Sequence, residues 1–500
     1  MPEIKDIEEH VLDRRRAGIL LHITSLPGEL ENGDLGREAF HFVDFLSTSG
    51  ISVWQLLPVG QTHDDGSPYQ CLSIHAGNPN LISLDWLEER GWLVKPKMPR
   101  VPGAAAEYRS VCLRKAFLAF SEKADDASRI DYQTFVAANA YWLDDYALYA
   151  VLKEKFFSTS WHEWPKQYRD RNTDALAEIR RNMESTIGRI KFEQYVFYRQ
   201  WHELRDYAHQ HGILLFGDMP IFVAYDSADV WVNRDHFALD ETGATRVVAG
   251  VPPDYFSETG QRWGNPHYNW ALMEENGFRW WIERLRTQLD LFDLVRIDHF
   301  RGLEAYWEIP ASEMTAMNGR WVKAPGDALL RKIRDVFGSI PLVAEDLGVI
   351  TPEVESLRDK FELPGMKILQ FAFDGGSKNP YLPLNHTPNS VVYTGTHDND
   401  TTVSWFDSLP GPVKGYVKEY LGFPGEKMPW PMVRCALASV SLLAVIPMQD
   451  VLGLGREGRM NTPGTVVGNW KWRFSWDQVT EQTLSRLARL VKLYGRSGHS

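Results

Sequence analysis

DLVRIDHFRG, residues Asp293–Gly302, is the stretch from which the fold of this chain can be predicted. Its branched apolar residues are those of a short buried strand, yet Arg296, Asp298 and His299 crowd its far end. Side chains alternate between the two faces of a strand, so Arg296 and Asp298 point the same way. The guanidinium should lower the pKa of the carboxylate, and an anionic carboxylate in a cleft can act as a nucleophile. The alternative is a buried ion pair that only fixes the register of the strand. If Arg-x-Asp were the only such feature in the chain, this alternative would be favoured.

Short apolar runs of the same kind recur along the chain, separated mostly by helical patterns. The eight predicted strand stretches are Ala17–Thr24, Ile51–Val59, Gly212–Val223, Asp293–Phe300, Ile340–Gly348, Met366–Phe373, Ser390–Thr396 and Leu443–Met448. Eight alternations of strand and helix predict an α/β fold, a closed (β/α)8 TIM barrel with its active site at the C-terminal face. A doubly wound open sheet is the alternative. No glycine-rich phosphate loop follows the first stretch, which counts against nucleotide binding.

A long segment without convincing strands interrupts this alternation. Its clearest helical face repeats at gaps of three or four and predicts a single helix through Phe135, Ala138, Trp142, Tyr146, Tyr149, Leu152 and Phe156. We therefore predict that residues 1–85 form the first part of the barrel. Residues 86–210 are expected to form a mainly helical insertion after the second strand. Residues 211–500 should complete the barrel and carry the active-site loops.

Composition excludes several classes of protein. The 44% hydrophobic and 24% charged content is typical of a soluble globular protein, and no apolar run is long enough to span a membrane. The formal net charge of −12 disfavours nucleic acid as a partner. The N-terminal sequence lacks the pattern of a secretory signal, and three scattered cysteines give neither a disulfide framework nor a metal-binding spacing. We expect a cytoplasmic protein without a metal site; the oligomeric state stays open.

Acidic residues close several of the predicted strands. They are Asp218 on the third, Asp298 on the fourth, Glu345 and Asp346 on the fifth, and Asp398 on the seventh. A helix cap or a salt bridge could explain any one of them. In a barrel, however, all these strand ends lie on one face, where several carboxylates would repel one another unless a site used them.

Cleavage of a glycosidic bond requires two such carboxyl groups, one to protonate the leaving oxygen and one to attack or stabilise the anomeric carbon. Asp298 beside Arg296 is expected to stay charged. Glu345 follows an apolar run, where desolvation should raise its pKa and leave it able to donate a proton. The alternation of side chains along the strand does not show whether Glu345 or Asp346 points into the site. The two neighbours lie on opposite faces, and a shift of the strand by one residue would exchange them.

Five motifs carry a resemblance to known enzymes. RIDHFRG, AEDLG and GTHDN resemble the catalytic strand-end motifs of the α-amylase clan. PPDYFSETGQRWGNPHYNW, residues Pro252–Trp270, and RMNTPGTVVGNWKWR, residues Arg459–Arg473, resemble the signatures of the 4-α-glucanotransferases called amylomaltases. The resemblance runs from the first strand through Arg473. The third strand lacks the Asn-His pair usual in amylases, which is itself an amylomaltase trait.

The resemblance implies a (β/α)8 barrel with helical insertions and a retaining double-displacement mechanism. Segments of α-1,4-glucan would be moved to a glucose or maltooligosaccharide acceptor, with no organic cofactor and no catalytic metal. Asp298 is similar to the nucleophile of the family, Glu345 to its acid/base, and Asp398 to the third carboxylate, which holds substrate hydroxyls. A hydrolytic α-amylase or α-glucosidase would use the same carboxylates, and a non-catalytic glucan-binding protein is a more remote alternative.

The substrate-binding residues expected around these carboxylates come from strand ends and from loops. They are Tyr69, Asp218, Tyr255, Phe256, Trp263, Arg296, His299, His397, Asn461, Pro463 and Gly464. The aromatic ones, and Trp270, lie in regions rich in glycine and proline, where sugar rings could stack on them. Aromatic residues that merely pin loops to the barrel are an equal alternative. Asn461 could bond sugar hydroxyls, while Pro463 and Gly464 should set an exposed turn.

Overall fold

A computed structural model describes residues 12–98, 103–253, 257–465 and 467–498. Its central sheet consists of β1 Arg16–Leu20, β2 Val53–Gln55, β3 Leu214–Met219, β6 Leu294–Ile297, β9 Leu342–Ala344, β10 Gly365–Ile368, β11 Ser390–Tyr393 and β12 Leu443–Pro447. All eight strands overlap the predicted stretches. They pair in parallel in the order β10-β11-β12-β1-β2-β3-β6-β9.

The two ends of this sheet meet and close it into the predicted barrel. The backbone N–H of Ala344 on β9 donates a 2.9 Å hydrogen bond to the carbonyl of Pro364, just before β10. Side chains from the strands fill the interior as one buried cluster, which includes Leu20, Val53, Phe216, Leu294, Val343, Met366, Val391 and Leu443. Leu294 faces inward, so its neighbour two positions on, Arg296, faces inward as well.

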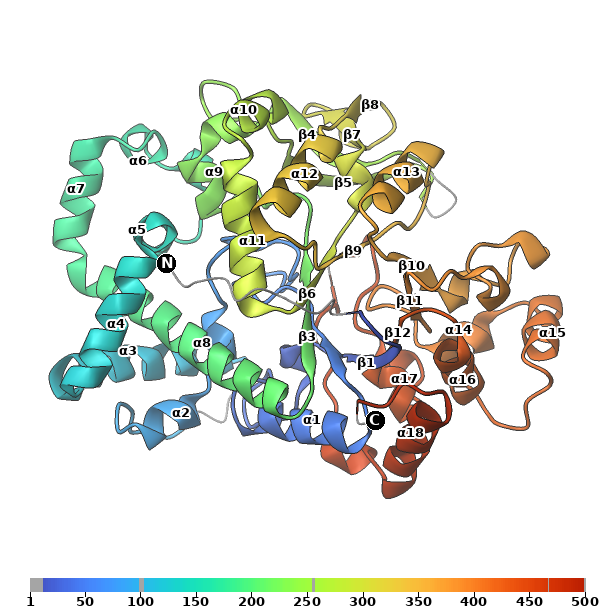
Figure 1. Ribbon diagram of the computed structural model, residues 1–500. Helices are drawn as coiled ribbons and strands as arrows, with labels where there is room; N and C mark the ends of the chain where they lie inside the picture. Colours follow the sequence, from blue (N-terminus) through green and yellow to red (C-terminus); the bar gives the residue numbers. More distant parts are fainter. Residues whose placement is uncertain (1–11, 99–102, 254–256, 466, 499–500) are drawn as a thin grey trace.

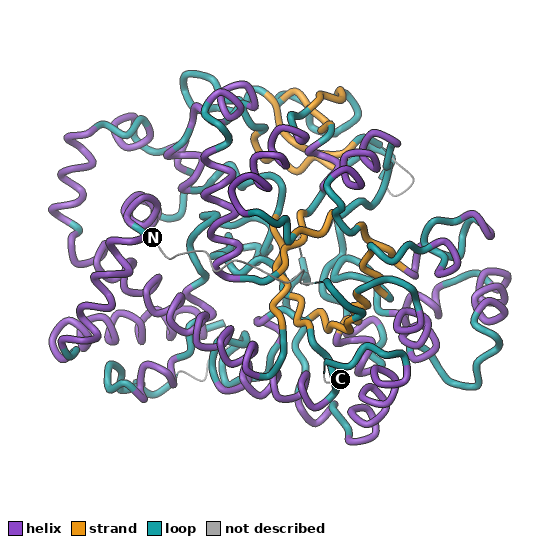
Figure 2. The backbone as a smooth tube through the Cα atoms, viewed as in Figure 1, coloured by secondary structure: helices purple, strands orange, loops and turns teal. Residues whose placement is uncertain are grey.

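Helices surround the barrel and extend well beyond it on one side (Figures 1 and 2). They are α1 Arg37–Thr48, α2 Leu84–Glu89, α3 Ala105–Lys123, α4 Asp126–Ala138, α5 Ala140–Lys155, α6 Lys166–Arg169, α7 Thr173–Asn182, α8 Glu184–Gln210, α9 Ala228–Val232, α10 Trp270–Glu275, α11 Arg279–Leu291, α12 Gly326–Phe337, α13 Pro352–Lys360, α14 Thr402–Ser408, α15 Gly411–Tyr420, α16 Trp430–Ala438, α17 Met448–Leu452 and α18 Glu481–Leu493. Within the described residues, none of the helices has the length and apolar character needed to cross a membrane.

In the sequence, helices α2 to α8 follow β2 and precede β3; they occupy the left of Figure 1. The prediction of one helix through residues 135–156 is wrong, because α4 ends and α5 begins around Asn139. The Asn139 side chain donates a 2.9 Å hydrogen bond to the carbonyl of Phe135, so it competes with the backbone ladder of the helix. The division of the chain at residues 85 and 210 stays a prediction.

A second sheet, which the sequence did not predict, lies beside the barrel at the top of Figure 1. Its antiparallel strands are β4 Val247–Val251, β5 Gln261–Pro266, β7 Ala305–Pro310 and β8 Arg320–Lys323, in the order β5-β4-β7-β8. Strand β5 lies inside the Pro252–Trp270 motif, so Trp263 belongs to a strand and not to a loop. Part of the segment that was expected to form a loop at the barrel mouth is therefore a β-strand.

Near the end of the chain, Arg496 fastens the seam between β1 and β12. Its guanidinium is buried and donates hydrogen bonds of 2.8 Å to the carbonyl of Arg16, 480 residues earlier, and 2.9 Å to that of Ser441. Its Nε donates a third, of 2.7 Å, to the carbonyl of Leu437. These carbonyls stand in for the carboxylate that a buried arginine usually finds.

Candidate active site

Arg296 on β6 lies at the centre of the site and is 4% exposed. Its Nη2 lies 2.7 Å from Oδ2 of Asp218 at the end of β3, and 3.0 Å from Oδ1 of Asp298. The same nitrogen donates a 3.0 Å hydrogen bond to the hydroxyl oxygen of Tyr69. The prediction that Arg296 and Asp298 share a face is therefore confirmed, and two further predicted site residues join them.

Tyr69 ties this ionic cluster to the end of β11. Its hydroxyl donates a 2.7 Å hydrogen bond to Oδ2 of Asp218 and lies 2.9 Å from Nε2 of His397. The two rings stack with 5.3 Å between centroids and 18° between planes. Because the single phenol proton goes to the carboxylate, the bond to His397 requires a proton on Nε2. Burial lowers the pKa of His397, so this imidazole is neutral.

Glu345 and Asp346 follow β9 and point to different partners. Oε2 of Glu345 accepts a 2.6 Å hydrogen bond from the backbone N–H of His299, and Oε1 accepts one of 3.0 Å from that of Leu347. Asp346 accepts from the backbone N–H of Met366 on β10 and forms an ion pair with Arg358 of α13. The structure thus makes the choice that alternation could not: Glu345 lies beside Asp298, and Asp346 supports the barrel wall.

The pKa values of Asp298 and Glu345 are both raised, chiefly by burial. The negative charge of Asp298 raises the pKa of Glu345 further. Arg296 lowers the pKa of Asp298 as expected, but burial and the charges of Asp218 and Asp398 act in the opposite direction. The expectation of a lowered pKa for Asp298 is therefore wrong. Its side chain keeps 31% of its surface exposed, so a substrate can still reach the carboxylate.

Asp398 is the most open of the three carboxylates, with 47% of its side chain exposed. Nδ2 of Asn461 donates a 2.6 Å hydrogen bond to its Oδ1, and Nε2 of His397 lies 3.4 Å from the same oxygen. Part of the hydrogen-bonding capacity that we expected Asn461 to offer to sugar hydroxyls is used in this way. The free side of Asp398 faces solvent.

The turn expected after Asn461 is present. The N–H of Thr465 donates a 3.2 Å hydrogen bond to the carbonyl of Thr462, with Pro463 and Gly464 between them. Gly464 has φ of +78°, which glycine adopts without strain, so proline and glycine occupy the positions typical of a type II turn. The turn begins at Thr462, directly after Asn461, the hydrogen-bond partner of Asp398.

His299 and Trp263 form one wall of the site. His299 has φ of +50°, a left-handed conformation rare outside glycine, and this conformation presents its N–H to Glu345. Its ring meets that of Trp263 edge to face, with 5.0 Å between centroids. Burial lowers the pKa of His299 to about 4. Trp270, by contrast, begins α10, is buried and stacks on Trp281 of α11, which fits the alternative of an aromatic residue that pins its segment to the protein.

Two of the predicted substrate-binding residues, Tyr255 and Phe256, lie outside the described residues.

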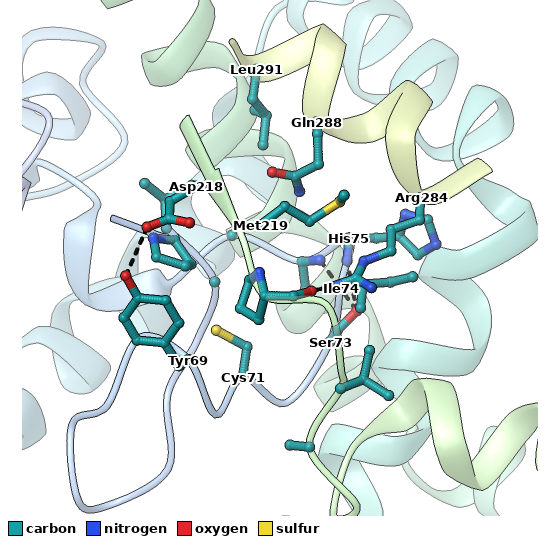
Figure 3. A pocket seen from close by; sticks show the side chains of 18 of the residues that line it. Tyr69, Cys71, Ser73, Ile74, His75, Asp218, Met219, Arg284, Gln288 and Leu291 are labelled. Atoms are coloured by element: carbon teal, nitrogen blue, oxygen red, sulfur yellow. Dashed lines mark hydrogen bonds between the residues drawn. The ribbon is translucent and has the colours of Figure 1, made fainter. Parts of the chain in front are cut away.

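A cavity of about 50 Å³ lies behind the ionic cluster. Figure 3 shows Tyr69 and Asp218 at one side of this cavity and Arg284 of α11 at the other. The guanidinium of Arg284 donates to the carbonyls of Pro220 and Ile221, directly after β3. It therefore braces the segment that carries Asp218. Sequence reasoning missed Arg284, because nothing local to α11 indicates which strand it contacts.

His22 is a second residue that sequence reasoning missed. It follows β1 by two positions, is 8% exposed and lies near His397, and burial together with that neighbour lowers its pKa to about 3. The sequence did contain a signal for it. His22 lies near the end of the first predicted strand stretch, and several other predicted strands also carry polar residues at this end. Among the described residues, no group of three or more His, Cys, Asp or Glu side chains could hold a metal ion.

Comparisons with known proteins agree with this geometry. The family described as 4-alpha-glucanotransferase matches residues 21–480. The 4-alpha-glucanotransferase of Thermus thermophilus is 50% identical over 492 residues, which is 96% of this chain and 98% of that protein. The 4-alpha-glucanotransferase of Synechocystis sp. is 47% identical over 499 residues, covering 97% of this chain and 99% of that one.

Solved structures agree as well. The amylomaltase from Streptococcus agalactiae in complex with acarbose superposes with a TM-score of 0.93 at 38% identity, over 97% of this chain and 100% of the other. The amylomaltase from Corynebacterium glutamicum, at 19% identity and a TM-score of 0.71 over 97% of this chain and 75% of that one, supports the fold alone. The sequence matches and the site geometry together establish that this chain belongs to the 4-alpha-glucanotransferase family.

Proposed function

We propose that this chain transfers segments of α-1,4-glucan to glucose or maltooligosaccharide acceptors by a retaining double displacement. The observation that carries the proposal is the placement of Asp298 and Glu345 at the ends of adjacent strands, joined through the N–H of His299. Two carboxyl groups in one cleft can supply the nucleophile and the general acid that a retaining enzyme needs.

In the first step, Glu345 protonates the departing glycosidic oxygen while Asp298 attacks the anomeric carbon. The bond from that carbon to the departing oxygen breaks, and an ester bond to Asp298 forms. This step requires a proton on one of the two carboxyl groups and a negative charge on the other. Arg296 contacts Asp298 directly at 3.0 Å and so favours the arrangement with the anion on Asp298 and the proton on Glu345.

In the second step, Glu345 must act as a base and take a proton from the acceptor hydroxyl. Formation of the ester removes the negative charge of Asp298, which is one cause of the raised pKa of Glu345. The two backbone N–H groups that point at Glu345 remain and favour its ionised form. The same carboxyl group is therefore protonated before the ester forms and able to accept a proton afterwards.

We propose that Asp398 binds the substrate hydroxyl groups that lie next to the reacting carbon. Its exposed carboxylate supports this role, since one oxygen is occupied by Asn461 while the rest of the group faces solvent. Tyr69, Asp218 and His397 hold Arg296 and the end of β11 in place around the sugar ring. Trp263, fixed against His299, offers an aromatic face for a neighbouring glucose unit.

The enzyme transfers glucan, and does not hydrolyse it, only if a hydroxyl of the acceptor sugar attacks the ester before water does. Two segments can exclude water from the mouth: the described part of residues 251–270, which includes β5 and Trp263, and that of residues 459–468, which includes the exposed turn at Pro463 and Gly464. Exclusion of water by bound sugar is the general means by which a site favours one acceptor.

The test is the product distribution from pure maltotriose. Transfer conserves glycosidic bonds, so we expect glucose and a ladder of longer chains while the number of reducing ends stays nearly constant. A steady rise in reducing ends without products longer than maltotriose would identify a hydrolase. Binding of maltotriose without any product would identify a glucan-binding protein.

We further propose that the enzyme works in the cytoplasm on soluble maltooligosaccharides and on glucan chains of the starch or glycogen type. Its three cysteines, Cys71, Cys112 and Cys435, are all free thiols, as expected in a reducing compartment. The helical segment of residues 86–210 should have no glucan activity by itself. Turnover by the isolated segment would contradict its assignment as an insertion.

A further inference from the structure

The loop between β11 and α14, residues 394–401, carries His397 and Asp398 at its apex. Thr394 at its start and Thr402 directly after its end are both bonded to one carboxylate, that of Asp450 in α17. Oδ2 of Asp450 accepts hydrogen bonds of 2.5 Å from Oγ1 of Thr394 and 2.6 Å from Oγ1 of Thr402. Oδ1 accepts one of 2.9 Å from the backbone N–H of Thr402. One side chain thus closes the base of the loop.

This junction is deeply buried. Asp450 is 1% exposed, and both threonines are fully buried. Burial raises the pKa of Asp450, while its three hydrogen bonds lower it. A buried polar group of this kind is costly to leave without partners, so the three donors hold the two ends of the loop at a fixed separation.

The apex of the loop is also held by other segments: Arg459 donates a 3.3 Å hydrogen bond to the carbonyl of Asp398, and Gln370 donates one of 2.9 Å to that of Asp400. Asp398 is half exposed and contacts Asn461 and His397. Inside the loop, Oδ1 of Asn399 accepts hydrogen bonds from the N–H and the hydroxyl of Thr396, at 2.8 and 2.9 Å. These bonds stiffen the loop, and Asp450 fixes the two residues through which it leaves β11 and enters α14, Thr394 and Thr402. A displacement at the base would carry Asp398 with it.

We propose that Asp450 is a positioning residue that sets the place of Asp398 at the barrel mouth. The inference rests on the role proposed above for Asp398. Asp450 does not reach the substrate, because it lies beneath the loop with both oxygens occupied by Thr394 and Thr402. Its removal should therefore affect the chemical step through Asp398 and not by loss of a substrate contact.

The first test compares Asp450→Ala with Asp450→Asn. Alanine removes all three acceptor positions, and we expect kcat to fall about 10- to 100-fold, the scale of a misplaced catalytic group, while KM changes much less. Asparagine can keep the bond from the Thr402 N–H and donate its amide to the two hydroxyls, which can act as acceptors. It should restore most of the activity.

A milder pair guards against a variant that fails to fold. Thr394→Val removes one hydroxyl without changing the shape of the side chain, and we expect a smaller fall in kcat, of several fold. Thr394→Ser keeps the hydroxyl and should behave like the parent. Ser441→Ala is the matched control, because Ser441 bonds Ser390 at 2.7 Å across the opposite ends of the same two strands. It should lower Tm without lowering kcat.

The decisive measurement is a double-mutant cycle with Asp398→Asn, using an activated maltosyl fluoride donor so that weak activity stays measurable. If Asp450 acts through Asp398, Asp450→Ala or Thr394→Val should have almost no further effect in the Asp398→Asn background. Equal fold-losses in both backgrounds would overturn the inference and leave only a structural role. Near-normal turnover by Asp398→Asn itself would instead refute the proposed role of Asp398, and the inference with it.

Discussion

The backbone N–H of His299 donates a 2.6 Å hydrogen bond to Oε2 of Glu345. The residue that follows Asp298 thus holds the other carboxyl group of the pair. His299 adopts a left-handed conformation, with φ of +50°, which directs its N–H at Glu345. Backbone N–H groups thus hold Glu345, while Arg296 holds Asp298, so both carboxyl groups have fixed positions. We expect their spacing to be about 5–5.5 Å, as in retaining enzymes.

The variants Asp298→Asn and Glu345→Gln should separate the two chemical roles. Each should leave a folded protein whose activity on maltotriose is reduced by about 10²-fold or more, because each removes a chemical step. With a maltosyl fluoride donor, whose leaving group needs no proton, Glu345→Gln should still form the ester, whereas Asp298→Asn should not. Mass spectrometry of the quenched enzyme measures the ester. An ester on Asp298→Asn would contradict the assignment.

The pH dependence of kcat/KM should report the raised pKa of Glu345. Activity requires Glu345 to be protonated, so it should persist above the ordinary pKa of a glutamic acid and fall as pH rises through the raised value. In Asp298→Asn the neighbouring charge is lost, so the pKa of Glu345 should decrease. Carbon-13 NMR titration of the side chain measures this change; an unchanged pKa would show that the two groups are not coupled.

The same raised pKa should reduce stability at neutral pH. Between the unfolded pKa of Glu345 and its raised folded value, the folded state binds more protons than the unfolded state. Its contribution to the free energy of unfolding therefore decreases as pH rises through this window. Glu345→Gln removes the titration, so its stability relative to the parent should increase from pH 4 to pH 8. Urea unfolding at several pH values tests the sign of this change.

Tyr69→Phe removes a hydroxyl that contacts Asp218, Arg296 and His397. A hydrogen bond to a charged group contributes about 1.5–3 kcal/mol, so kcat/KM should fall by about one to two orders of magnitude. Tyr149→Phe is the matched control, because the hydroxyl of Tyr149 on α5 also donates to an aspartate, Asp226, which is not among the proposed site residues. It should lower Tm and leave kcat/KM nearly unchanged. Equal activity losses in both variants would argue against a specific role for Tyr69.

Asp346→Asn should do the opposite of Glu345→Gln. Asp346 joins the N–H of Met366 to Arg358, so its neutralisation weakens the contact of β9 with β10 and α13. We expect a loss of about 1–3 kcal/mol in the free energy of unfolding. Substrate turnover measured well below the new Tm should change only slightly. A turnover loss as large as that of Glu345→Gln would mean that the two neighbours share the chemistry.

The barrel was predictable because its strands are buried on both faces and therefore appear as short apolar runs. The two outer strands of the second sheet, β5 and β8, escaped prediction for the opposite reason. Strand β8, RWVK, is mostly exposed, and β5, QRWGNP, contains glycine and proline, so neither has the composition of a buried strand. The two central strands, β4 and β7, pair with each other from distant parts of the sequence, which local patterns do not report.

The candidate site was predictable where one strand end carried the information and not where distant elements decide. Asp298, Glu345 and Asp398 each close a predicted strand. The choice of Glu345 over Asp346 depends on Arg358 in α13 and on the backbone of β10. The pKa of Asp298 depends on all the protein that surrounds it, so the adjacent Arg296 alone suggested the wrong direction. The break at Asn139 follows from a side-chain bond that competes with the helix.

The seam fastened by Arg496 also constrains how this protein is made. Of the eight barrel strands, β1 is synthesised first and its neighbour β12 last. Until then one edge of β1 has no partner, and an open strand edge invites association with other chains. Closure across so long a stretch of sequence also makes folding slow. Chains that end before Arg496 should therefore aggregate during expression, even though every residue proposed for catalysis has already been made.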